Sequence, residues 1–139
     1  MAVTEFTTGR GTVANAGHEH PVVCHRDGRY EPVVYMHSPP LGMIEDIRIE
    51  ERIYELRPDD RLFVFTDGVT EAMNEGEELF GMDRTLAALN RDPSSDPETL
   101  LRRVRQEIDA FAGTAPQFDD ITMLALHYRG KGGDGNETI

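Results

Sequence analysis

Phe65-Thr66-Asp67-Gly68-Val69 and Phe118-Asp119-Asp120-Ile121-Thr122 are the two stretches that decide the fold of this chain. The first follows an apolar run over residues 61–65, which predicts a buried strand that ends just before Asp67. The second precedes an apolar run over residues 121–126, which predicts a strand that starts just after the two aspartates. If these strands are antiparallel neighbours, the end of one lies beside the start of the other. Asp67 and Asp119 would then meet at one rim of a sheet.

Acidic oxygens that converge at a sheet rim suit a hard cation such as Mg²⁺ or Mn²⁺. We expect the carboxyl groups of Asp67 and Asp119 to lie within about 6 Å of each other, because one ion takes oxygen ligands at roughly 2.0–2.6 Å. Taken alone, Asp67 is also explained as a turn residue before glycine, and Asp119-Asp120 as a loop that enters a strand. Their joint position favours the metal site.

Other polar residues carry weaker signals. Asp59-Asp60 follows a proline and is typical of a plain turn. His18 and His20 have a spacing that could bind a metal, but the glycine and the proline around them favour a loop. Cys24 lies in a predicted strand, which favours a packing role over that of a nucleophile.

The chain begins with strand-like segments and continues with helices. Turn signals predict two hairpins, and the strands are expected over residues 2–7, 12–16, 21–25, 30–34 and 47–56. A short helix is expected over residues 82–90. A longer helix should begin at Asp96-Pro97 and end at Gly113, because its apolar residues recur at steps of three and four. Residues 130–139 are rich in glycine and polar residues, which predicts a disordered tail.

Composition narrows the class of protein. The chain has 139 residues, of which 38% are hydrophobic, enough for one domain with a core. A net charge of −12 argues against nucleic acid and anionic membranes as partners, since phosphate groups would be repelled. The single cysteine excludes an internal disulfide. No signal peptide is visible and no stretch approaches the roughly 20 apolar residues of a membrane span, so we expect a soluble, cytoplasmic protein.

Five motifs occur in order along the chain: Asn15-Ala16-Gly17-His18, Pro39-Pro40-Leu41-Gly42, the run over residues 58–72, Leu79-Phe80-Gly81 and Asp119-Asp120-Ile121-Thr122. Together they resemble the later part of a bacterial PP2C-like phosphatase domain, of the type found in regulators of sporulation and stress-response sigma factors. The resemblance spans roughly residues 1–128, so residues 1–129 are expected to be one C-terminal portion of such a domain.

The resemblance implies a fold, a reaction and a set of metal ligands. The fold would be α+β, with two stacked antiparallel sheets flanked by helices. Such enzymes are serine/threonine phosphatases that hold two Mg²⁺ or Mn²⁺ ions on aspartates, and a water on the ions attacks the phosphorus of the substrate. Asp67 and Asp119 match two ligands of one ion. Asp120 and Gly68 adjoin them and are expected to support the site or to contribute to it directly.

The resemblance also implies partners. The substrate class would be a phosphorylated antagonist of an anti-sigma factor, and a sensor or regulatory domain would precede the phosphatase domain. A complete domain of this kind opens with an acidic segment that nothing before Asn15 matches. We therefore expect an incomplete domain that is inactive alone and that forms homodimers through uncovered sheet edges. The alternatives are a non-catalytic binding module with the same fold and an unrelated acidic, β-rich metal-binding protein.

Overall fold

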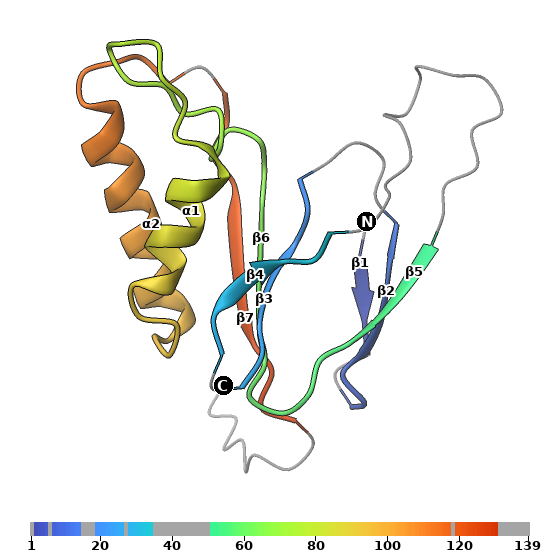
Figure 1. Ribbon diagram of the computed structural model, residues 1–139. Helices are drawn as coiled ribbons and strands as arrows, with labels where there is room; N and C mark the ends of the chain where they lie inside the picture. The colour runs from blue at the N-terminus through green and yellow to red at the C-terminus, as the bar shows by residue number, and fades with distance from the viewer. Residues whose placement is uncertain are drawn as a thin grey trace, which may run out of the picture.

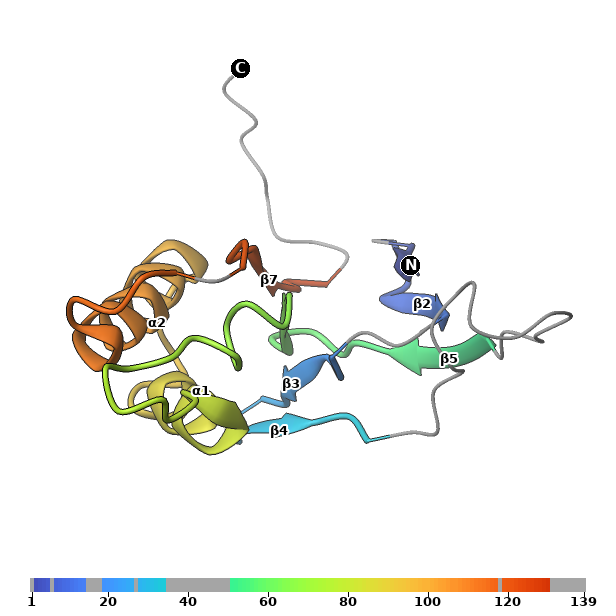
Figure 2. The ribbon, with the colours of Figure 1, turned by 90° about the horizontal axis from the view of Figure 1, so that it is seen from above.

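Two antiparallel sheets and two helices form three layers in the computed structural model, which describes residues 2–5, 7–14, 19–26, 28–34, 51–117 and 119–130 (Figure 1). One sheet has the strand order β1-β2-β5 and the other the order β4-β3-β6-β7. Seen from above, both helices lie on one side of the four-stranded sheet and the three-stranded sheet lies on the other (Figure 2). The strands are β1 (Ala2–Thr4), β2 (Arg10–Ala14), β3 (Val22–Cys24), β4 (Tyr30–Pro32), β5 (Glu51–Glu55), β6 (Arg61–Phe65) and β7 (Met123–His127), and the helices are α1 (Gly81–Asn90) and α2 (Pro97–Ala112).

β6 is the central strand, paired with β3 on one side and β7 on the other, as predicted from its continuous apolar run. Because successive side chains of a strand point to opposite faces, β6 contributes to two cores. Phe63 and Phe65 pack with the core against the helices. Leu62 and Val64 pack with Tyr128 in the core between the sheets. The predicted two-sheet α+β fold is therefore confirmed.

The predicted long helix is α2, and its ends follow the expected chemistry. The Asp96 carboxylate accepts a hydrogen bond from the Thr99 N–H at 3.0 Å, and Pro97 occupies the first turn. Gly113, with φ of 61°, ends the helix. The buried face of α2 repeats every four residues, through Leu100, Val104 and Ile108.

Both predicted hairpins are present; β1, β3 and β4 are shorter than expected, and β2 begins at Arg10, two residues earlier than expected. β1 pairs with β2, and β3 pairs with β4. β5 falls inside the strand predicted over residues 47–56, of which residues 47–50 lie outside the described part of the chain. Residues 131–139 of the predicted tail and the motifs at residues 15–18 and 39–42 also lie outside it.

Neither described helix is long and apolar enough to cross a membrane.

Candidate metal-binding site

The antiparallel pairing of β6 and β7 brings the two aspartate motifs to the same rim of the sheet. Phe65 at the end of β6 pairs with Met123 at the start of β7, and Arg61 pairs with His127 at the other end. The segment after Phe65 and the segment before Met123 must therefore lie side by side. This is the arrangement that the sequence predicted.

Thr66 joins the two segments at this rim. Its N–H donates to the Thr122 carbonyl at 3.0 Å, and its hydroxyl donates to the Asp120 carbonyl at 2.8 Å. The Thr66 hydroxyl also accepts from the Thr122 N–H at 3.0 Å, because the Thr66 carbonyl accepts instead from Val69. A side-chain hydroxyl thus replaces a backbone acceptor, and the regular ladder stops. This explains why β7 begins at Met123, two residues later than predicted.

Gly68 permits close contact between the two segments. It is buried, and a Cβ atom built on it would lie 2.5 Å from the Asp120 carbonyl oxygen and 3.3 Å from the Asp119 carbonyl oxygen. Contacts below 3.0 Å to backbone atoms are not found for real Cβ atoms. The glycine after Asp67 is therefore required for this packing, and the backbones of the two aspartate motifs touch.

Asp67 and Asp119 are exposed at this rim, and each carboxylate makes a hydrogen bond through one of its two oxygens. Asp67 Oδ1 accepts from the Gly68 N–H at 3.1 Å, and Asp119 Oδ1 accepts from the Asp120 N–H at 2.7 Å. Within the described residues, the Oδ2 atom of each has no hydrogen bond or ion pair. Oxygens of this kind are the ligands that Mg²⁺ and Mn²⁺ prefer, so the donor set fits such a cation.

Two carboxylates are fewer than a complete dication site needs. In the ranges that the structure describes, no group of three or more His, Cys, Asp and Glu side chains is placed to hold a metal ion. His18 lies outside these ranges, and His20 belongs to no such group. The separation of about 6 Å between the two carboxyl groups stays a prediction.

A further acidic residue reaches the Asp67 loop and was not found from the sequence. Glu19 Oε1 accepts a hydrogen bond from the hydroxyl of Thr70, which is buried, at 2.9 Å. The same hydroxyl lies 3.2 Å from the Asp67 carbonyl oxygen. The segment that follows the Asn15–His18 motif therefore contacts the loop, and only the fold could reveal this contact.

Asp60 was interpreted as a plain turn residue, and the structure adds that its carboxylate is buried. It accepts hydrogen bonds from the Arg57 N–H at 2.9 Å, the Arg26 N–H at 3.0 Å and His25 Nδ1 at 2.9 Å. Burial alone would raise its pKa, but the Arg57, His25 and Arg26 hydrogen bonds together lower the pKa below its ordinary value. Asp60 precedes β6 and Asp67 follows it, so the two carboxylates lie at opposite ends of that strand.

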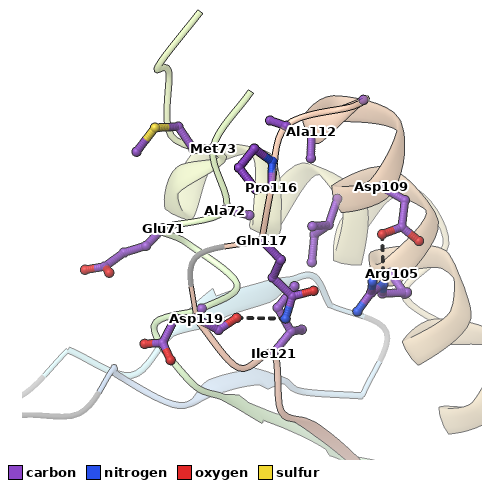
Figure 3. A pocket seen from close by; sticks show the side chains of 14 residues that line it. Glu71, Ala72, Met73, Arg105, Asp109, Ala112, Pro116, Gln117, Asp119 and Ile121 are labelled. Atoms are coloured by element: carbon purple, nitrogen blue, oxygen red, sulfur yellow. Dashed lines mark hydrogen bonds and ion pairs between the residues drawn. The ribbon is translucent and has the colours of Figure 1, made fainter. Parts of the chain in front are cut away.

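A cavity of about 240 Å³ opens beside the rim (Figure 3). Gly68 and Asp119 line it together with the second half of α2 and the loop that follows the helix. Its polar lining includes Glu71 and the ion pair between Arg105 Nε and Asp109 Oδ1, whose atoms are 2.9 Å apart. Figure 3 shows Glu71 on the opposite side of the cavity from this pair.

The fold corresponds to that of PP2C-like phosphatase domains. The SiaA-PP2C domain of Pseudomonas aeruginosa has a TM-score of 0.72 at 17% identity, over 86% of this chain and 46% of that one. The Mn-presoaked phosphatase domain of the cell fate determinant SpoIIE from Bacillus subtilis has a TM-score of 0.69 at 14% identity, over 91% of this chain and 54% of that one. These similarities define the class of fold.

The family follows from the sequence match. Residues 1–129 match the family described as Stage II sporulation protein E (SpoIIE), and the chain belongs to that family. This excludes an unrelated acidic metal-binding protein.

Two curated relatives are much longer than this chain. Protein IcfG of Synechocystis sp. is 30% identical over 127 residues, which cover 91% of this chain and 20% of IcfG. Phosphoserine phosphatase RsbP of Bacillus subtilis is 35% identical over 57 residues, which cover 41% of this chain and 14% of RsbP. The chain therefore spans a fifth or less of these relatives and about half of the similar solved domains.

Proposed function

We propose that this chain is part of a metal-dependent protein serine/threonine phosphatase and supplies Asp67 and Asp119 as ligands of Mn²⁺ or Mg²⁺. The observation that carries the proposal is the backbone contact between the two aspartate motifs, made through Gly68 and Asp120. Exposed carboxylates with free oxygens support it, as does membership of a phosphatase family. The Mn-presoaked form of the SpoIIE domain supports the choice of ion.

The residues of this chain have distinct roles in the proposed chemistry. A bound dication lowers the pKa of a coordinated water and neutralises charge on the phosphoryl group. Asp67 and Asp119 hold the cation, and Thr66 fixes the spacing of the segments that carry them. Gly68 leaves room for the close contact between the two segments, and the backbone carbonyl of Asp120 takes part in this contact.

The isolated chain should have negligible activity. A dication held by two carboxylates and waters is bound weakly, and a second ion needs further acidic ligands. The absence of a third suitable group among the described residues supports this view. We therefore expect turnover only when the chain is joined to the remaining, acidic segment of a complete domain.

The test is Mn²⁺-dependent hydrolysis of a phosphoserine peptide and an aryl phosphate. The 139-residue chain alone should show no turnover, and the chain joined to the remainder of a domain should be active. Asp67→Asn or Asp119→Asn should then lower kcat by a hundredfold or more, whereas Asp83→Asn, on an exposed turn of α1, should leave it unchanged. An inactive complete domain would contradict the proposed phosphatase function. Robust turnover by the isolated chain would contradict the expectation that the chain needs the remainder of the domain for activity.

One observation favours a second candidate, a non-catalytic module that keeps the fold to recognise a protein. Among the described residues, no group of three or more His, Cys, Asp and Glu side chains is placed to hold a metal ion, which is also what a family member without activity would retain. An inactive complete domain that binds its phosphoprotein as tightly as it binds the unphosphorylated form would support this candidate.

We propose that the substrate is a phosphorylated regulatory protein of the anti-sigma-factor-antagonist class and that the reaction takes place in the cytoplasm. The relatives are much longer than this chain, which supports a sensor or regulatory domain upstream in the whole protein. The net charge of −12 supports a protein substrate over nucleic acid or an anionic membrane.

A further inference from the structure

The cavity beside the aspartate rim is lined by both apolar and charged side chains. Part of its lining consists of small and branched apolar side chains, among which Ile108 is buried: Ala72, Ile108, Ala112 and Ile121. In the same lining, the guanidinium of Arg105 is paired with Asp109. Glu71 is exposed, and its carboxylate has no hydrogen bond or ion pair with any described residue.

The size of the cavity suits one side chain. At about 240 Å³, it lies below the roughly 300–1,000 Å³ of small-molecule sites and far above the roughly 30 Å³ of a water. The apolar part of this lining favours an aliphatic side chain over a polar one, because burial removes apolar surface from water.

The position of the cavity relates it to the proposed reaction. Gly68 and Asp119 line the cavity and also belong to the aspartate rim, so the cavity begins where the phosphorylated residue would be held. An extended peptide advances about 3.3–3.6 Å per residue. A residue within about three positions of the phosphoserine would therefore reach the cavity.

We propose that this cavity is a specificity pocket, which accepts one aliphatic side chain of the phosphoprotein close to the phosphoserine, while Glu71 pairs with a Lys or Arg beside it. This rests on the proposed phosphatase function and names the kind of segment that the site selects. Once a cation neutralises Asp119 and Arg105 is paired with Asp109, Glu71 is the remaining charge among the described residues that line the cavity, and it attracts a basic side chain.

The test uses a set of alanine-based peptides that each contain one phosphoserine. In each peptide, a single leucine occupies one of the three positions before or after the phosphoserine. Binding to the 139-residue chain is followed by NMR in the presence of Mg²⁺. Leucine at one position should tighten binding about tenfold over the peptide without leucine, since a leucine side chain is then buried. The amides of Ala72 and Ala112 should shift in the same titration.

Ala112→Leu fills the pocket and should remove the tenfold gain. Ala110→Leu makes the same change on the exposed side of α2 and should preserve it. Replacing alanine by lysine next to the selected leucine should tighten binding further in the wild type but not in Glu71→Gln. Glu77→Gln, in the same exposed loop, is the matched control.

Binding is measured without turnover, so the two proposals can fail separately. If the chain prefers leucine but a complete domain does not hydrolyse the peptide, the specificity pocket is supported and the proposed phosphatase function is contradicted. If a complete domain hydrolyses the peptide but the chain shows no preference for leucine, the phosphatase function is supported and the specificity pocket is contradicted. The absence of a leucine effect at every position, or a gain that persists in Ala112→Leu, also overturns it.

Discussion

Gly68 is the residue whose size the candidate site depends on most. Gly68→Ala would place a methyl group 2.5 Å from the Asp120 carbonyl oxygen, so one of the two segments must move. We expect a loss of about 1–3 kcal/mol in the free energy of unfolding, as for other overpacked positions, together with weaker Mn²⁺ binding. Urea denaturation and Mn²⁺ titration measure the two effects.

Gly76→Ala is the matched control, since its methyl group would meet only the end of the Asn74 side chain, at 3.3 Å. It should change stability by less than about 0.5 kcal/mol. Equal effects of the two substitutions would show that the contact at Gly68 has no special role.

Asp60 makes the stability of the chain depend on pH. Its folded-state pKa lies below the unfolded value of about 3.9, so its contribution is present above that pH and is lost as the pH falls through the folded pKa. Unfolding followed from pH 7 to pH 2 should show a loss of stability below about pH 4. Asp60→Asn should lower the stability at pH 7 by about 1–3 kcal/mol and make the acid loss smaller.

Asp83→Asn, on an exposed residue of α1, is the control for this pH dependence. It should keep the acid profile of the wild type. A profile of Asp60→Asn that parallels the wild type across the whole range would contradict the role of Asp60.

At the scale of elements, the sequence predicted what depends on local pattern. The sequence predicted β6 and α2 because the residues that specify them lie within each segment: the continuous apolar run of β6, and the capping residues and apolar repeat of α2. The shared rim of Asp67 and Asp119 was also predicted, since antiparallel pairing alone requires it. The late start of β7 was not, because it depends on a hydroxyl from another strand.

Contacts between distant segments set the limit of prediction at the site. Nothing in the local sequence pairs Glu19 with Thr70, because the two residues meet only through the packing of separate segments. The buried state of Asp60 depends in the same way on donors from the β3–β4 connection. The cavity is a third example, since α2, the Asp67 loop and the segment before β7 together create it.

Thr66 connects β6 to the segment before β7 through its hydroxyl. Thr66→Val keeps the shape of the side chain but leaves the Thr122 N–H and the Asp120 carbonyl without this partner. We expect a loss of about 1–2 kcal/mol, measured by urea denaturation, and faster amide exchange at Thr122. Thr122→Val removes a hydroxyl that is exposed and should cost much less. Equal losses would contradict the role of Thr66.

At the scale of the whole molecule, the two edges of the four-stranded sheet differ. At the β4 edge, the Asn90 side chain accepts from the Tyr30 N–H at 2.7 Å and donates to the Tyr30 carbonyl at 2.9 Å, and Pro32 has no N–H. In the described part of the chain, β7 pairs with β6 alone. β7 is therefore the edge open to another strand.

We predict that the chain self-associates at micromolar concentration through β7 of a second copy. Leu124, 54% exposed on β7, would be covered in the dimer, so Leu124→Lys should weaken association at least tenfold in sedimentation experiments. Leu79→Lys, at a loop residue that is 48% exposed, should have no effect. A monodisperse monomer over this range would contradict the prediction.

The central claim is that Asp67 and Asp119 bind one dication at the β6–β7 rim, and paramagnetic broadening by Mn²⁺ in NMR spectra of the chain tests it most directly. Amide signals of Gly68 and Asp120 should broaden first, since they adjoin the two carboxylates. Asp67→Asn and Asp119→Asn should each remove this selective broadening, whereas Asp83→Asn should leave it unchanged. Broadening that is centred elsewhere, or that persists at the rim in both variants, would contradict the claim.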